Sequence, residues 1–520
     1  MKSRILVFVF LSIATWLQAQ ISQPARWEQE NKYTDETYSV ISLKEDGIAL
    51  LRELEQYRNS KRVWQLVILD TALHERWTNE VELHAEMRFT GYEYVPGKLN
   101  LMFRRNETDI LRAEILMVDL GSQLIQFSKT EVKLQIRLTH YTVVDGSSVF
   151  GGYVTSEPVL IIFDPIKESN IIVPGFFLPE TELLDVRPNK NNTFSILLSQ
   201  RTQGKKKLIF RTLDKLGNIL IEDEMGIDEE KTVLSGVVSV LEHDEVMIAG
   251  AYTFNNSKLA SGIFSSMIDP YSDQRLQYTE FHQFQHFLDY MSDKRASKIR
   301  EKASLRSNRP PDFKTHLGVH RIEEFKGGFA FFGESYILST GSSGSYSNSA
   351  YNPSARAYGN PSSFTPFSNR FYNNPYQYPS SVASEELRII EGFAVGFDFK
   401  GRRLWDYSIP MDEYESLSHE QVSDFTVHNN IPHFFFKKEN ELKFSNHSTD
   451  TLQINEVISL PIKLNSEYEE SKSSDDDLGY VRHWYDTFFF VWGVQTVKDL
   501  RREEHIPSRR VFFINKIQLD

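Results

Sequence analysis

One unit recurs along most of this chain, and it limits the fold more than any other feature. The unit is an apolar strand, a polar turn, a second apolar strand that ends in an acid, a short turn and a third strand. It is clearest at 147–165, 192–224 and 245–270. The acid returns about every 45 to 55 residues along the first five copies. It stands at Asp70, Asp119, Asp164, Asp214, Asp269 and Asp398.

The last interval between these acids is longer because it contains two insertions, roughly 288–325 and 338–385. Without them the spacing returns to about 43 residues. Two degenerate copies follow, at 431–446 and 487–515, and each has an Asn where the acid stood. The chain therefore contains about eight units over residues 34–520.

This period, with three or four short strands in each unit, is typical of a β-propeller blade. The strands are runs of Val, Ile, Phe, Tyr and Thr bounded by Gly, Asn, Asp and Pro. We predict an all-β fold: a single β-propeller of seven or eight four-stranded blades over 34–520, with one short helical insertion and one low-complexity loop. The alternatives are a pair of two-sheet sandwiches and a β-solenoid. The units are too long for solenoid coils, and a sandwich would not repeat eight times.

The recurring acid is explained by turn formation. It is followed closely by glycine in Asp119–Gly121 and Asp214–Gly217. An Asp carboxylate accepts backbone N–H groups two residues further on, while Gly supplies a positive φ. We favour this interpretation over a metal-binding or catalytic role for these acids.

At 397–405 the chain reads FDFKGRRLW. This resembles the repeat of pyrroloquinoline-quinone-type and WD-type β-propellers, in which a strand ends in D-x-x-G-x-x-x-W. The resemblance covers one unit well and the others in outline, so it implies the fold and not the cofactor. No calcium or quinone ligands are identified in the sequence, and no cofactor is predicted.

Ring closure in propellers often pairs a strand from one end of the chain with the blade formed by the other end. Thr34–Leu43 (TDETYSVISL) precedes the first full unit. We predict that it completes the last blade beside Arg510–Gln518, because that pairing removes two exposed strand edges at once.

The first nineteen residues have the order of a secretory signal. Lys2 and Arg4 precede an apolar run from Ile5 to about Trp16, and small and polar residues lead to a cleavage site expected after Ala19. Its LQAQ ending resembles signal peptides of the Bacteroidota. We therefore expect an exported protein that is periplasmic, outer-membrane-associated or extracellular. The apolar run is too short to span a bilayer, so a membrane anchor is the less favoured reading. No later segment predicts a span, and peripheral membrane association stays open.

The composition limits the classes of ligand and of chemical site that the chain can have. The formal net charge is −13, which disfavours general binding to nucleic acid. The chain contains no Cys, so disulfides, thiolate metal sites and Cys nucleophiles are excluded.

The first insertion, 280–325, is predicted to be helical and basic. Phe281, Phe284, Leu288 and Met291 are spaced by three and four residues, as in an amphipathic helix. Residues 291–309 include seven basic residues and two acidic ones. They form either a solvated helix face or a docking surface for an acidic protein partner or membrane headgroups. The predicted partner-binding residues here are Lys294, Arg295, Lys298 and Arg300.

Three residues of the same helix carry groups that can bind a metal. His282, His286 and Asp289 would share a helix face, a spacing that can converge on Zn²⁺. No Glu follows the first His, so the metalloprotease pattern is missing. We favour surface or interface histidines and predict no metal site.

The second insertion, 339–384, is a Ser/Asn/Tyr/Pro-rich loop that cannot build a core. Its aromatic side chains would suit partner binding, although an idle surface loop is equally consistent with the composition. The candidate residues are Tyr346, Tyr351, Tyr358, Phe364, Phe367, Phe371, Tyr372, Tyr376 and Tyr378. A third segment, 465–479, is predicted to be an acidic loop.

The chain lacks a GxSxG elbow, a Gly-rich phosphate loop and an HExxH motif. No catalytic residue is therefore assigned, and an enzyme is less favoured. Two hypotheses remain. The first is a non-catalytic scaffold of the bacterial envelope that binds proteins through its face and insertions. The second is a carbohydrate-binding or carbohydrate-active propeller with carboxylates in its central funnel.

Overall fold

The structure is a computed structural model. It describes residues 21–31, 38–105, 110–241, 245–254, 257–271, 274–305, 313–338, 387–416, 420–446, 457–475, 479–501 and 508–519. The predicted signal segment 1–19 and the predicted loop 339–384 lie outside these residues. The chain divides into two compact units, a five-blade unit (Glu86–Gln421) and a three-blade unit (Met1–Ala85 with Val422–Asp520).

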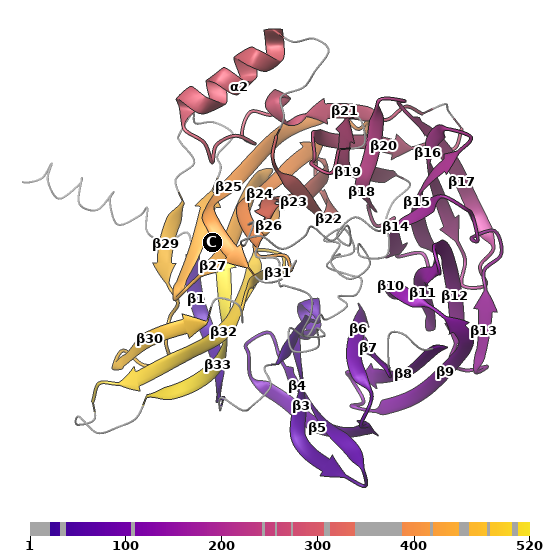
Figure 1. Ribbon diagram of the computed structural model, residues 1–520. Coiled ribbons are helices and arrows are strands. Elements are labelled where there is room, and N and C mark those ends of the chain that lie inside the picture. Colours follow the sequence, from indigo (N-terminus) through magenta and orange to yellow (C-terminus); the bar gives the residue numbers. More distant parts are fainter. Residues whose placement is uncertain are drawn as a thin grey trace, which may run out of the picture. The chain divides into compact units, whose positions relative to one another are not determined.

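The five-blade unit contains five antiparallel sheets of four strands, each pairing in chain order (Figure 1). Their strands are β6 (Arg88–Val95), β7 (Lys98–Arg104), β8 (Ile110–Asp119) and β9 (Ile125–Gln135); β10 (Arg137–Val144), β11 (Ser147–Val154), β12 (Glu157–Asp164) and β13 (Ser169–Ile172); β14 (Thr181–Pro188), β15 (Phe194–Thr202), β16 (Lys205–Leu213) and β17 (Ile219–Ile227); β18 (Lys231–Val238), β19 (Val246–Phe254), β20 (Gly262–Ile268) and β21 (Gln277–Glu280); and β22 (His316–Phe325), β23 (Gly328–Leu338), β24 (Leu387–Phe397) and β25 (Arg403–Ser416). The inner strands β6, β10, β14, β18 and β22 contact one another in that order.

The three-blade unit contains three sheets. They are β2 (Ser39–Ser42), β3 (Ile48–Arg58), β4 (Lys61–Leu69) and β5 (Glu75–His84); β26 (Asp424–His428), β27 (Ile431–Lys438), β28 (Glu441–Asn446) and β29 (Ile458–Pro461); and β1 (Ile21–Glu30), β33 (Arg509–Leu519), β32 (Phe488–Asp499) and β30 (Glu469–Asp475), with β31 (Val481–Tyr485) also beside β32. A 3-10 turn, η1 (Lys44–Asp46), joins β2 to β3.

The predicted fold class is confirmed. The described residues form eight antiparallel blades of a β-propeller, so the structure selects eight over seven. The single α-helix among the described residues, α2 (Asp293–Leu305), lies in the first insertion. Within the segment predicted as an acidic loop, residues 469–475 form strand β30 because they pair with β32.

The recurring acids form turns, as predicted. The Asp214 carboxylate accepts the backbone N–H groups of Leu216 and Asn218, both at 2.9 Å. Asp398 does the same for Lys400 at 2.9 Å and Arg402 at 2.8 Å. The glycines that follow, Gly217 and Gly401, have φ of 84° and 75°, which L-residues rarely adopt.

The predicted closing strand is wrong. The strand beside β33 is β1, whose residues 21–30 pair with 511–519. Residues 39–42 instead form β2, the inner strand of the first blade. The apolar Val40, Ile41 and Leu43 are buried there. The half-buried, more polar β1 suits the outside of a sheet.

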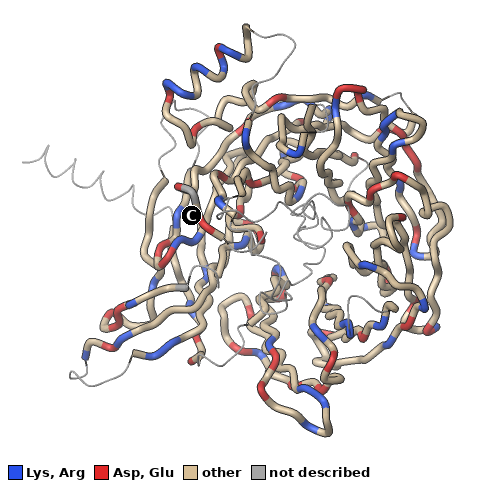
Figure 2. Tube along the Cα trace, viewed as in Figure 1, with Lys and Arg blue, Asp and Glu red and all other residues tan. Residues whose placement is uncertain are grey.

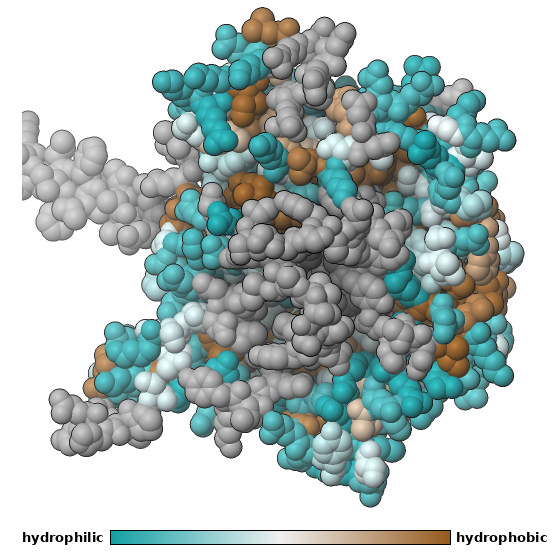
Figure 3. Space-filling view, in the orientation of Figure 1, coloured by the Kyte–Doolittle hydropathy of each residue, from teal (hydrophilic) through white to brown (hydrophobic). Residues whose placement is uncertain are grey.

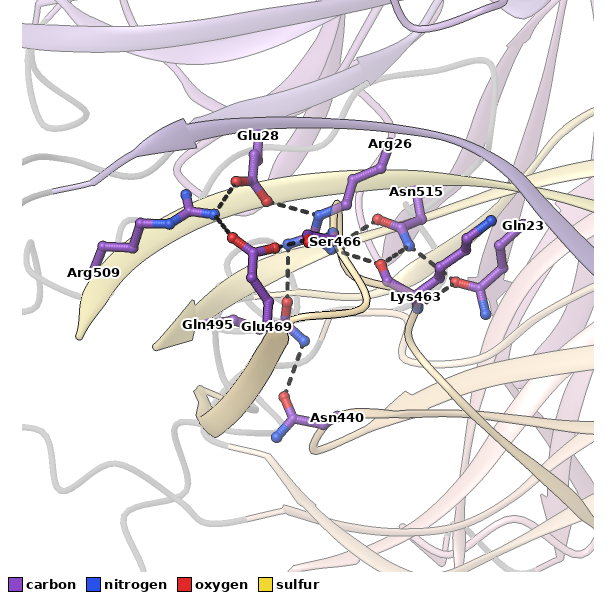
Figure 4. A network of polar contacts seen from close by, with 10 residues as sticks. All are labelled: Gln23, Arg26, Glu28, Asn440, Lys463, Ser466, Glu469, Gln495, Arg509 and Asn515. Atoms are coloured by element: carbon purple, nitrogen blue, oxygen red, sulfur yellow. Dashed lines mark hydrogen bonds and ion pairs between the residues drawn. The ribbon is translucent and has the colours of Figure 1, made fainter. Parts of the chain in front are cut away.

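A closing network of polar side chains surrounds β1 (Figure 4). The Arg26 guanidinium contacts Glu28 at 2.8 Å, Asn515 at 2.9 Å and Gln495 at 3.1 Å. Arg509 donates from β33 to Glu469 on β30 and forms an ion pair with Glu28. The network therefore joins four strands of one sheet, β1, β33, β32 and β30, and the charges of Arg26, Glu28 and Glu469 within it are nearly buried. Its residues are Gln23, Arg26, Glu28, Asn440, Lys463, Ser466, Glu469, Gln495, Arg509 and Asn515.

Arg26→Met should lower the free energy of unfolding by about 3–5 kcal/mol, because it leaves the carboxylate of Glu28 nearly buried with one cation fewer. The matched control is Arg112→Met, which removes the exposed ion pair with Glu131 and should cost less than about 1 kcal/mol. Chemical denaturation followed by fluorescence measures both. Equal losses would show that the closing network does not hold β1.

Candidate interaction site

The first insertion is fixed to the last blade of the five-blade unit by aromatic packing. Phe281, Phe284 and Phe287 are fully buried. Phe284 and Phe287 each lie 5.0 Å from Phe393 of β24, measured between ring centroids. These contacts bury large apolar areas, so the start of the insertion belongs to the core of the blade.

The predicted helix through Phe281–Met291 is wrong in position. A 3-10 turn, η2 (Phe281–Gln283), is followed by successive turns in which Asp289 N–H donates to His286 C=O at 3.0 Å and Met291 N–H to Leu288 C=O at 2.9 Å. The α-helix begins at Asp293. The spacing of three and four arises because each short turn returns an apolar side chain to the same core.

Strand β25 holds the insertion by hydrogen bonds to its backbone. The carboxylate of Asp406 accepts the N–H of His286 at 2.8 Å, and the hydroxyl of Ser408 donates to the C=O of His286 at 2.9 Å. Arg403 donates to the C=O of Gln283 at 3.2 Å. A segment without regular structure thus has its backbone groups satisfied by an adjacent strand.

The three candidate metal ligands do not meet at one centre. His286 lies 2.7 Å from the carboxylate of Asp289, whereas His282 lies 3.2 Å from Glu280. Among the described residues, no group of three or more His, Asp or Glu side chains is placed to hold a metal ion.

A carboxyl group lies in the core of the same blade. Glu391 on β24 is fully buried and accepts from the hydroxyl of Ser335 at 3.4 Å. Burial raises the pKa of Glu391 well above its ordinary value. The folded state therefore keeps a proton that the unfolded chain releases near pH 4.5.

Helix α2 presents basic residues on the face opposite its anchor. Ala296 and Ala303 are buried, and Arg300 on the same side donates to the C=O of Gln285 at 2.7 Å and of Phe284 at 3.3 Å. The exposed face carries a lysine stripe (Lys294, Lys298, Lys302) with Arg295 beside it. Figure 2 shows these charges along α2, and Figure 3 shows the mainly hydrophilic surface of the helix.

The predicted site residues divide into three groups. Lys294, Arg295 and Lys298 are exposed on α2, while Arg300 is half-buried and holds the helix to the turns before it. The nine aromatic candidates lie outside the described residues. They are Tyr346, Tyr351, Tyr358, Phe364, Phe367, Phe371, Tyr372, Tyr376 and Tyr378.

Sequence reasoning missed the polar residues that position the insertion. Asp406 and Ser408 bond to a residue about 120 positions earlier, and no local pattern reports such a contact. It also missed a buried polar cluster on the inner strands, which includes Asp185 and Arg187. The available signal there was a charged pair inside an otherwise apolar strand, LLDVRP.

Comparison with known proteins gives likenesses of fold only. No family model matches the chain, and no curated protein matches it. Prolyl oligopeptidase B from Galerina marginata is 12% identical with a TM-score of 0.32, and the match covers 58% of this chain and 38% of that one, so the chain spans well under half of its length. The β-propeller domain of the Trilobed protease from Pyrococcus furiosus is 9% identical with a TM-score of 0.32, covering 84% and 95%. The polysaccharide lyase Uly1 is 8% identical with a TM-score of 0.39, covering 95% and 92%.

Likeness at this level carries no argument about activity. The fold assignment therefore rests on the strand pairing of the chain itself. Within the part of the chain that the structure describes, we find no helix with the length and apolar character needed to cross a bilayer.

Arg300→Gln should loosen α2, because the side chain loses its charged hydrogen bonds to two carbonyl groups. Amide exchange over 293–305 should become about ten- to a hundredfold faster. Lys302→Gln on the exposed face of the same helix is the control and should leave exchange almost unchanged. Mass spectrometry of deuterium uptake distinguishes the two; equal uptake would mean that Arg300 does not anchor the helix.

Glu391→Gln should stabilise the protein progressively as the pH rises. Above about pH 4.5 the unfolded wild-type chain releases the proton that folded Glu391 retains, so wild-type stability falls. The variant carries a neutral group at every pH and escapes this loss. Its melting temperature relative to wild type should therefore increase as the pH rises above about 4.5. A difference independent of pH would show that Glu391 is ionised in the fold.

Proposed function

We propose that this chain is a non-catalytic β-propeller scaffold that binds an acidic segment of another protein through α2. The observation that supports this most is the lysine stripe on the exposed face of the helix. Lys294, Lys298 and Lys302 follow at intervals of four residues, so their side chains leave the helix about 6 Å apart. A partner with carboxylates at a similar interval would match them in position and in charge.

The positions of the basic residues along the helix dipole distinguish partner binding from simple stabilisation of the helix. Basic residues near a helix C-terminus are favourable, which accounts for Lys302 without any partner. Lys294 and Arg295 lie in the first turn, where a positive charge is unfavourable. Their placement costs helix stability, and an anionic partner would offset that cost.

The anchor also supports a binding role. The turns before α2 are held by buried aromatics and by hydrogen bonds from Asp406, Ser408 and Arg403. A helix fixed in this way loses little further freedom when a partner docks, so more of the interaction energy appears as affinity.

The location of this function is proposed from the N-terminal sequence. The charged, apolar and small-residue order of 1–19 favours export. We accordingly place the scaffold in the bacterial envelope, in the periplasm or at the outer membrane, with a protein partner in the same compartment.

Reversing the lysine stripe tests the proposal. A variant with Lys294→Glu, Lys298→Glu and Lys302→Glu should bind a labelled helical peptide with Glu at every fourth position at least about tenfold more weakly than wild type, because three attractive contacts become repulsive. The control reverses three exposed lysines on blades of the same unit, Lys133, Lys326 and Lys400. Its net charge is identical, so it separates a site from a general charge effect. Fluorescence anisotropy at physiological salt measures both.

Two results would contradict the proposal. Equal weakening in both variants would mean that overall charge, and not α2, attracts the peptide. Binding to vesicles of anionic lipid without binding to the peptide would assign α2 to a membrane surface instead.

A further inference from the structure

The last strand of the sheet β14–β17 has a strand partner on one side only among the described residues. β17 pairs with β16 and ends the sheet at its outer side (Figure 1). In an antiparallel pair, every second residue of a strand directs its backbone N–H and C=O away from the partner. β17 therefore presents a row of backbone groups with which a further extended chain could pair.

The other outer strands of the five-blade unit are shorter or carry residues that discourage such pairing. β13 and β21 have four residues each, and β9 carries Lys129 and Lys133 on its exposed face. β25 contains Pro410, which has no N–H to donate. β17 has nine residues, contains neither Lys nor Pro, and pairs regularly over residues 221–227. Its length and composition therefore leave this edge open to another strand.

The exposed side of β17 has an apolar end and an acidic middle. Leu216 in the preceding turn, Ile219 and Leu220 are 51%, 44% and 55% exposed. Exposed apolar side chains that gather at one place often mark an interaction site. Glu222 and Glu224 follow on the strand, with side chains 42% and 48% exposed. A partner would therefore need apolar side chains at one end of the edge and cationic side chains beside its middle.

Basic residues on β16 neutralise this edge only in part. Arg211 forms an ion pair with Glu222, and Lys207 forms one with Glu224 at 2.6 Å. Asp223, between the two acids, adds a third carboxylate against two cations. Each carboxylate has a second oxygen that can accept a further hydrogen bond. A cationic side chain on an added strand would therefore meet an excess of negative charge.

A second copy of the chain fits this edge poorly. Two β17 strands paired antiparallel over their full length would place Glu222 opposite Glu224, and Asp223 opposite its own counterpart. Like charges directly opposite each other are destabilising. The acids therefore act against pairing of β17 with itself, while they leave the edge open to a strand of opposite charge.

We propose that β17 is a docking edge for an extended basic segment of another protein, which adds to the sheet as a further strand. Antiparallel addition would place basic side chains opposite Glu224 and Glu222, and apolar side chains against Leu220 and Ile219. From its N-terminus the segment would carry two basic residues at alternate positions, followed by apolar residues. Backbone hydrogen bonds would supply affinity, and the side chains specificity. This surface is independent of the α2 site, which attracts acids, so either proposal can fail without the other.

The probe is the fluorescent peptide TTKTKTLVT, and fluorescence anisotropy measures its binding to the full chain. Saturable binding is expected. The peptide TTETETLVT should bind at least about tenfold more weakly, because its acids would lie opposite Glu222 and Glu224. Two N-methylated forms of the first peptide test strand pairing itself. Methylation of one alternate set of amides should abolish binding, and methylation of the other set should leave it nearly unchanged, because only one set of N–H groups faces β17.

Glu222→Gln combined with Glu224→Gln should weaken binding about three- to thirtyfold, since two pairs of opposite charge across the strands are lost. The control is Glu131→Gln combined with Glu168→Gln, which removes two exposed acids of the same unit and should leave affinity unchanged. Exposed ion pairs contribute little to folding, so both variants should melt near the wild type. Reversal of the lysine stripe on α2 should not weaken binding of this peptide.

The absence of saturable binding by TTKTKTLVT would overturn the proposal. Equal affinity of the two N-methylated peptides would overturn it too, because it would mean that the peptide does not pair with a strand edge. Equal weakening in the control variant would assign the attraction to overall charge. A wild-type dimer in sedimentation that Leu220→Lys dissociates would assign the edge to a second copy of the chain instead.

Discussion

The pairing of β1 with β33 is the contact on which the three-blade unit depends. The two strands come from opposite ends of the chain. Without β1, the outer edge of β33 would have unpaired backbone groups. The closing network adds side-chain specificity to this pairing. Arg26 reaches Asn515 and Gln495 on two successive strands, so a shift of β1 by one residue would turn its guanidinium away from both.

Most of the fold could be predicted from the sequence because each blade is formed by residues that lie close together in the chain. Each hairpin is specified by its own alternation and by its own turn, and Asp214 with Gly217 contains all that the turn needs. The closing strand could not be chosen in the same way. Both Ile21–Glu30 and Thr34–Leu43 are compatible with strand structure. The choice between them depends on contacts of Arg26 with residues far along the chain, and the residue spacing does not predict such contacts.

The candidate site could likewise be predicted only in part, because some of its features depend on residues that are distant in the chain. The basic character of α2 is visible in the sequence, but the sequence does not distinguish Arg300, which donates to backbone carbonyls, from Lys298, which faces solvent. The apolar spacing from Phe281 to Met291 indicated a helix because both a helix and a series of short turns return side chains to one side. Which of the two forms depends on Asp406 and Ser408, which satisfy the backbone of the turns from a distant strand.

The buried charges of the inner strands are difficult to explain by stability alone. A buried ion pair such as Asp185–Arg187 often contributes no more than well-packed apolar residues of the same volume, and its replacement can stabilise a protein by about 1–4 kcal/mol. Asp185 does satisfy the N–H of Val238, which links two neighbouring blades and accounts for one carboxylate oxygen. That role needs neither Arg187 nor the second oxygen. A neutral acceptor such as Asn could also accept that N–H, so the charge of the pair is not needed for the link between the two blades.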